Sequence, residues 1–284
     1  MRNVRRRTTL ALVLVLVVAC GNASDTASEK RVPADIPPKT LDDWAAFPAD
    51  RAPRPLLIIG DLPMAAPSER MPDELKTMTR NRAFVRKFGP VETPSGKVRV
   101  ELPDGPAEMS LISAEKAFTA MARPAPDTVE VVRGELGSAS FGTDMGAVKL
   151  PAWLFYVRGA EAPVAWPAID PAALWKPGEV RATAVAADAR LAPDGRSLTV
   201  SLPGPPDPCP GQQPVRYETR VIESEQAVAV GVRAVGAPAE DCVRLAFGRM
   251  ADYGFVLKSA LGGRVLVDAQ GGVIPVTRPP SIIR

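Results

Sequence analysis

Ser113 and Lys116 are the side chains whose types and spacing point most directly to chemistry, because they form a Ser-x-x-Lys pattern. In such a pattern the serine hydroxyl lies one helical turn from the lysine, and a desolvated amine can accept the serine proton and activate a nucleophile. The spacing therefore raises the hypothesis of a serine/lysine hydrolase. The structural alternative is that Ser113 caps a helix over residues 114–123, which Pro124 ends.

The rest of the chain favours the capping interpretation. Ser-x-x-Lys is the core motif of penicillin-binding proteins and serine β-lactamases, but no Ser-Asp-Asn follows it, and residues 258–260 (Lys-Ser-Ala) lack the glycine of Lys-Thr-Gly. The chain also contains no histidine, which excludes Ser-His-Asp and Cys-His catalysis and the commonest zinc and iron ligand sets. We therefore predict no catalytic residues, no metal site and no cofactor.

Three other groups of side chains have both a functional and a structural interpretation. Paired acids such as Glu223 and Glu225 permit glycoside hydrolysis if a cleft holds them at the right separation, but solvated turns explain them equally well. The basic residues between 70 and 87 permit contact with anionic lipids or wall polymers, although a charged solvent face is the simpler interpretation. The aromatic residues could line a groove or form a core seam; they are Trp153, Phe155, Tyr156, Trp166 and Trp175.

Cys20 is the most informative residue for location. It follows a basic segment with four arginines and an apolar stretch from residue 10 to residue 19, the order typical of a secretory signal peptide. A cysteine directly after the small residue Ala19 resembles a bacterial lipobox, which implies cleavage before Cys20 and attachment of diacylglycerol, with palmitate-like acyl chains, to its sulfur. A membrane span needs about 20 apolar residues, so this stretch is too short for a transmembrane helix.

If Cys20 carries lipid, an even number of cysteines remains that can pair with each other, namely Cys209 and Cys242. Disulfides form outside the cytoplasm, and closing the loop between these positions would stabilise the fold by roughly 3–4 kcal/mol in the chain-entropy model. We predict a Cys209–Cys242 disulfide; the alternative is two free, buried thiols.

The charge balance argues against nucleic acid as a partner. Removal of residues 1–19 takes away four arginines and no acidic residue, which changes the formal charge from +3 to −1. A basic domain for nucleic acid binding is therefore not indicated. A hydrophobic content of 46% is sufficient for a packed core, and 31 prolines disfavour long helices.

The sequence predicts an α+β fold that is mostly β, in four segments. Residues 1–19 are the lipoprotein signal peptide. Residues 20–54 are the lipidated cysteine and a flexible tether, which permits a short contact with the folded part near Trp44 and Phe47. Residues 55–180 form a mixed α+β region. Residues 181–284 form a sandwich-like region of short antiparallel strands, because alternating runs recur about every ten residues.

Several elements can be predicted individually. A helix is expected within residues 73–88, and residues 150–157 should form a central strand because both of its faces are apolar. Residues 164–169 should return antiparallel to that strand. In the second half, a turn at 193–196 precedes a strand over 197–202, residues 217–222 and 227–232 form a hairpin, and residues 265–267 and 273–276 form a closing hairpin.

Four stretches resemble a group of uncharacterised exported proteins and lipoproteins of actinobacteria. The similarity extends mainly over residues 110–277, and the stretches that carry it are residues 150–155, 194–200, 223–230 and 261–268. These are strand and turn patterns. The resemblance implies a shared β-rich fold with two cysteines in the second half, and it implies no activity.

Together these features predict an envelope lipoprotein on the extracytoplasmic face of the cell membrane, held there by its lipid. The leading hypothesis is a non-catalytic module that binds a cell-wall polymer or an envelope protein. One alternative is a wall-directed hydrolase that uses Ser113 and Lys116 or carboxylates. Another is a signalling accessory of an envelope membrane protein.

Overall fold

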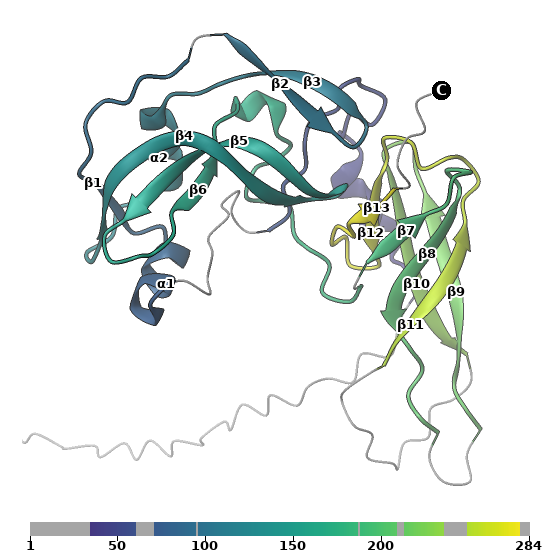
Figure 1. The fold of residues 1–284 in the computed structure, drawn as a ribbon. Helices are drawn as coiled ribbons and strands as arrows, with labels where there is room; N and C mark the ends of the chain where they lie inside the picture. Colours follow the sequence, from purple (N-terminus) through teal and green to yellow (C-terminus); the bar gives the residue numbers. More distant parts are fainter. Residues whose placement is uncertain are drawn as a thin grey trace, which may run out of the picture. The chain divides into compact units, whose positions relative to one another are not determined.

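A computed structural model of the chain describes residues 35–60, 71–94, 96–186, 188–208, 213–235 and 249–278. This part is mostly strand with a few short helices (Figure 1), which confirms the predicted α+β, mostly β class. Among the described residues, no helix is both long enough and apolar enough to cross a membrane.

The elements up to residue 180 are the 3₁₀ helices η1 (Pro38–Trp44) and η3 (Pro171–Ala173), the helices α1 (Asp73–Arg80) and α2 (Ala114–Met121), and the strands β1 (Phe84–Arg86), β2 (Lys97–Leu102), β3 (Gly105–Ser110), β4 (Val129–Thr143), β5 (Gly146–Val157) and β6 (Val164–Pro167). The later elements are the strands β7 (Ala189–Leu191), β8 (Ser197–Pro203), β9 (Arg216–Glu223), β10 (Ala227–Val235), β11 (Met250–Val256), β12 (Val265–Asp268) and β13 (Val276–Thr277).

The first sheet is built around the long β4–β5 hairpin, and its strand order is β1-β4-β5-β6. β6 returns antiparallel to β5 as predicted, with Trp153 opposite Trp166. β5 is central and covered on both faces, which confirms the expectation drawn from its sequence. Phe155 packs on one face with helix α2, and Leu150 packs on the other face with the β2–β3 hairpin.

The helix predicted within residues 73–88 is shorter than that range and is followed by a strand. α1 ends at Arg80, and two residues later Arg82 takes a positive φ of 60°. The chain then enters β1, where Phe84 is buried and lies in parallel register with Val129 of β4. Phe84 reaches the core by pairing with a strand more than 40 positions away in the chain, and the local charged and apolar pattern contains no sign of that partner.

The second region is a sandwich of two small sheets, with strand orders β12-β10-β9 and β11-β8-β7-β13. Residues of both sheets, including Leu198, Val200, Val228 and Val230, share one core cluster. The predicted β9–β10 hairpin is present, with Val228 opposite Glu223.

The predicted turn between β7 and β8 is also present, and its cause is local. The Asp194 carboxylate accepts hydrogen bonds from the backbone N–H groups of Arg196 and Ser197 and from the Ser197 hydroxyl. Gly195 has a φ of 68°, a conformation that glycine adopts without strain. These bonds hold the pKa of Asp194 at about 2, below its usual value of 3.8.

The closing hairpin predicted at the C-terminal end forms only in part. Asp268 accepts bonds from the N–H groups of Gln270 and Gly272, and Val267 pairs with Val273. The principal partner of β12, however, is β10, in parallel register. The chain then leaves for the other sheet, where β13 pairs with β7.

The expectation of a flexible tether as far as residue 54 is wrong for residues 35–54. η1 and its neighbours pack through Ile36, Leu41, Trp44 and Phe47 against residues of β10 and β12 in one core cluster. The Thr40 hydroxyl also donates a hydrogen bond to the Ala269 carbonyl at 3.2 Å. The contact anticipated near Trp44 and Phe47 is therefore a buried core contact, stabilised by removal of apolar surface from water.

The same cluster crosses the boundary expected at residues 180 and 181. Leu57 and Val180 pack in it beside Val265 and Val273, and the Gly60 N–H donates to the Val180 carbonyl. Since Leu56 and Ile58 pack in a core cluster of the first region, residues 35–60 take part in the packing of both strand-rich regions.

Candidate functional site

Ser113 and Lys116 form a helix cap in the structure. The Ser113 hydroxyl accepts a hydrogen bond at 3.2 Å from the backbone N–H of Lys116, and the Lys116 side chain is exposed. Ser113 lines a depression of about 110 Å³ beside the Arg86–Glu115 ion pair, and Lys116 does not line it. The two side chains therefore do not converge on one cleft, and the capping interpretation of Ser113 is confirmed.

The paired acids within the described residues serve local structure. Glu223 accepts from the Lys258 N–H at 2.7 Å and pairs with Arg264 at 2.8 Å, whereas Glu225 is exposed. Asp73 pairs with Lys76 on the first turn of α1. These carboxylates do not face one another across a cavity, so they do not form a glycosidase pair.

Four of the five aromatic residues pack in core clusters, Tyr156 does not, and the five do not share one groove. Trp153, Phe155 and Trp166 are buried in the cluster beneath α2, and the Trp153 indole N–H donates to the Ile112 carbonyl at 2.8 Å. Trp175 packs separately, 5.4 Å from Phe47 between ring centroids. Tyr156 lies on the other face of β5, under the Arg133 guanidinium.

The basic stretch between residues 70 and 87 is partly neutralised by contacts inside the protein. Arg82 donates to the Met121 and Ala120 carbonyls at the end of α2 and stacks on Trp166. Arg86 pairs with Glu115. These two arginines therefore hold α2 against the first sheet, whereas Arg80 and Lys87 are exposed and have no ion-pair partner in the described part of the chain.

Cys20, Cys209 and Cys242 lie outside the described residues, and the lipid anchor and the disulfide therefore remain predictions. The strand ends that flank the two later cysteines are described: Pro203 of β8 lies opposite Met250 of β11, and Arg216 of β9 lies opposite Val235 of β10. The connection with Cys209 joins β8 to β9, and the connection with Cys242 joins β10 to β11. Since β8 pairs with β11 and β9 pairs with β10, both connections begin and end at these two strand pairs.

The most unusual chemistry in the described residues is an arginine–aspartate cluster that consists of a buried Arg54–Asp144 pair, the half-buried Arg278 and the exposed Asp104. The side chains of Arg54 and Asp144 are only 2% and 4% exposed, and Arg54 Nη2 donates to Asp144 Oδ2 at 2.7 Å. Arg54 Nε lies 3.6 Å from Asp104 Oδ2, which is an ion pair without a hydrogen bond. Buried charges of this kind are rare unless they are paired.

Four separate segments bring this cluster together. Arg54 follows η1 and lies with its guanidinium 5.6 Å from the Phe47 ring centroid. Asp104 lies in the β2–β3 turn and Asp144 in the β4–β5 turn, where the Asp144 carbonyl accepts from the Val276 N–H at 2.9 Å. Arg278 follows β13 and donates to the Gly262 carbonyl at 2.7 Å.

Burial shifts the pKa of two members of the cluster, Asp144 and Arg278. Burial raises the pKa of Asp144, although the charge and hydrogen bond of Arg54 act in the opposite direction. Burial and the like charge of Arg54 lower the pKa of Arg278. The hydrogen bonding is also incomplete, because Arg54 Nε, Arg54 Nη1, Asp144 Oδ1 and Arg278 Nε have no partner among the described residues.

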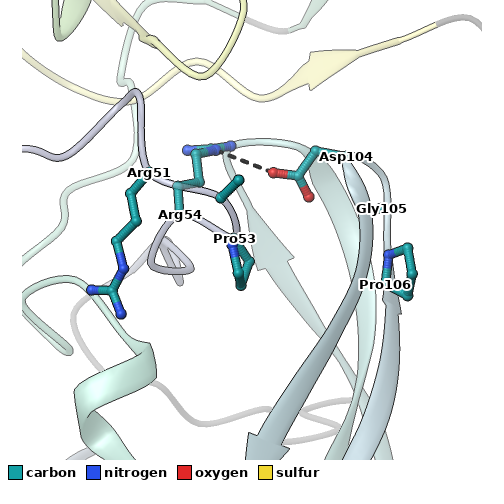
Figure 2. A pocket seen from close by; sticks show the side chains of 7 residues that line it. Arg51, Pro53, Arg54, Asp104, Gly105 and Pro106 are labelled. Atoms are coloured by element: carbon teal, nitrogen blue, oxygen red, sulfur yellow. Dashed lines mark ion pairs between the residues drawn. The ribbon is translucent and has the colours of Figure 1, made fainter.

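Arg54 and Asp104 line a depression of about 280 Å³, named the arginine depression below; Figure 2 shows its lining, which consists of Arg51, Ala52, Pro53, Arg54, Asp104, Gly105 and Pro106. Arg51 is exposed and has no ion-pair partner in the described part of the chain. The Arg54 guanidinium points toward the Asp104 carboxylate, whereas the Arg51 side chain, which also lines the depression, extends away from both (Figure 2). The lining can bind a polar ligand but contains no nucleophile.

Sequence reasoning missed this site. Arg54 lies in a proline-rich stretch assigned to the tether, and its partners follow 50, 90 and 224 positions later in the chain. No motif connects them. Within the described residues, no group of three or more acidic or cysteine side chains is placed to hold a metal ion.

The fold and the site define a mostly β α+β protein with an arginine–aspartate cluster beside an open depression. No protein-family model matches the chain, and neither the curated proteins nor the solved structures contain a significant match. The resemblance to exported actinobacterial lipoproteins therefore stays a prediction from the sequence.

Proposed function

We propose that the protein is a membrane-anchored envelope lipoprotein that acts as a binding module and holds its ligand in the arginine depression. The signal peptide and Cys20 support export and lipid attachment on the extracytoplasmic face. The acyl chains on Cys20 would provide the two signals that stable anchoring requires. The expected ligands are a cell-wall polymer or an envelope protein.

One observation carries the binding role: among the described residues, the nearly inaccessible Arg54 guanidinium has donors without a partner, and it lies beside an open depression that a second arginine without an ion-pair partner also lines. The hydrolase alternative has less support, because the Ser113 hydroxyl is engaged with backbone and the Lys116 side chain is exposed. Activation of serine requires a base within hydrogen-bond reach.

The test is capture of the full-length, lipidated protein, kept in detergent micelles, by purified cell-wall polymer and by immobilised envelope proteins; both materials are free of lipid bilayer, so the acyl chains do not themselves cause retention. We expect retention by one of these materials, and we expect Arg51→Gln to reduce it. Arg158→Gln is the matched control, since Arg158 is 69% exposed and lies outside the cluster. If wild type, Arg51→Gln and Arg158→Gln are retained equally, the arginine depression is not the binding site.

The same preparations separate binding from hydrolysis. If incubation releases soluble wall fragments, and Ser113→Ala abolishes that release while the fold is intact, the protein is a hydrolase and the proposed binding role is wrong. Lys116→Ala then identifies whether the lysine takes part.

A further inference from the structure

We propose that the arginine depression recognises an oxyanion group, a carboxylate or a phosphate, and that Asp104 occupies the place of that group in the unliganded protein. This inference rests on the proposed binding function and specifies its ligand chemistry. It follows from the donors of Arg54, from the position of Asp104 and from the charge balance of the cluster.

The donors of Arg54 exceed their acceptors. A guanidinium has five N–H donors in one plane, and among the described residues only Nη2 of Arg54 makes a hydrogen bond, to Asp144. Nε and Nη1 are buried without a partner among the described residues. Planar donors of this kind match the two oxygens of a carboxylate or phosphate better than any neutral group.

Asp104 covers the unsatisfied side of Arg54 without bonding to it. Its carboxylate is 28% exposed, compared with 2% for Arg54, and its nearest oxygen lies 3.6 Å from Nε. The dashed line in Figure 2 marks this ion pair between the two sides of the depression. Asp104 belongs to a tight turn in which Gly105 has a φ of 125° and no atom lies near its Cβ position. Because the Asp104 carboxylate is partly exposed and makes no hydrogen bond to Arg54, a ligand oxyanion can replace it if the turn shifts outward.

The charge balance favours an anion as the ligand. Three arginines (Arg51, Arg54 and Arg278) lie at or beside the depression with two aspartates, and among the described residues neither Arg51 nor Arg278 has an ion-pair partner within 4.0 Å. An anion that contacts Arg51 and displaces Asp104 would neutralise the excess. A cationic ligand would have only Asp104 as an exposed partner and would face two arginines.

The test uses the full-length protein with inorganic phosphate in one arm and acetate in the other, at constant ionic strength set with sodium chloride. The readout is the shift of the arginine Nε–H resonances on titration, which reports contact with an anion directly. Saturable shifts with phosphate only, with acetate only, or with both support the proposal and identify the oxyanion source. No saturable shift with either anion overturns it.

The variants give effects of opposite sign, which a merely structural role would not produce. Arg51→Gln should weaken binding by about tenfold, and Asp104→Asn should strengthen it by about tenfold, the ratio that corresponds to about 1.4 kcal/mol. Arg158→Gln and Asp252→Asn are the controls for loss of a surface charge, since both residues belong to exposed ion pairs. If either variant fails to change the affinity in the expected direction, or if the control variants change it by the same factor, the proposal is overturned.

The outcomes also separate this inference from the proposed function. A protein that envelope material retains regardless of these substitutions keeps the binding role but loses this site. A protein that binds phosphate or acetate with the expected variant effects, yet is not retained by any envelope material, keeps the site and loses the proposed role.

Discussion

Replacement of Asp144 by alanine removes the acceptor of the most deeply buried ion pair in the described structure. Arg54 Nη2 would lose its 2.7 Å hydrogen bond, and the guanidinium would stay 2% exposed with only Asp104, at 3.6 Å, as a counter-charge. The substitution keeps the backbone carbonyl that accepts from Val276. The effect is therefore mainly that of an unpaired buried charge.

The expected magnitude follows from the burial of both partners. Removing one member of a buried ion pair destabilises a protein by about 3–5 kcal/mol, and for a domain of this size the Tm falls by about 10 °C. The Glu130–Arg158 pair is the matched control, because its 2.6 Å contact is as short but its side chains are 36% and 69% exposed. Glu130→Gln should cost no more than about 1 kcal/mol.

The assay is urea unfolding of the full-length protein, with Asp144→Ala, Arg54→Met and the double variant forming a cycle. Burial raises the pKa of Asp144 above 3.8 in the folded protein. The folded state thus holds this proton more readily than the unfolded chain, and the contribution of Asp144 falls as pH rises through the raised pKa. All variants are therefore compared at one pH. A loss below about 1 kcal/mol for Asp144→Ala, or a double variant equal to the sum of the single ones, would refute the reasoning.

Three further predictions concern the anchor, the bridge and a turn. Cys20→Ala should give a protein without lipid that leaves the membrane fraction; unchanged mass and retention would contradict this. Thiol labelling after non-reducing denaturation should find Cys209 and Cys242 blocked, and two labels would exclude the disulfide. Because Asp194 has a pKa of about 2 in the folded protein, its stabilising contribution is present above 3.8 and is lost as pH falls through about 2. Wild type should therefore unfold at a higher temperature than Asp194→Asn at pH 6 but not at pH 2; parallel curves would contradict the assignment.

The features that sequence reasoning predicted correctly depend on neighbours in the chain. The Ser113 cap bonds to a backbone group three residues away, and the turn at Asp194 is held by residues two and three positions later. The central position of β5 follows from its own two apolar faces. In each case the pattern within about ten residues contains the physical cause.

The features that it missed depend on partners far along the chain. Ile36, Leu41 and Trp44 are buried because β10 and β12, roughly 190–230 positions later, provide the surface on which they pack. In isolation their segment is rich in proline and charge, which reads as a tether. The same reason explains β1, whose strand character comes from β4.

Arg54 is the extreme case, and its incomplete hydrogen bonding separates two explanations for its burial. If the arginine served only to hold the η1 segment, the β4–β5 turn and β13 together, its donors would be saturated, because buried polar groups are nearly always paired and a hydrophobic residue of similar size would stabilise as well. Instead Nε and Nη1 have no hydrogen-bond partner among the described residues, and the Asp104 carboxylate lies 3.6 Å from Nε, on a turn that borders an open depression. Sequences depart from full polar satisfaction chiefly at functional sites. A guanidinium that is fixed on one side by Asp144 and unsatisfied on the other has the arrangement of a binding group, since the fixed side sets its orientation and the free side can bind an anion.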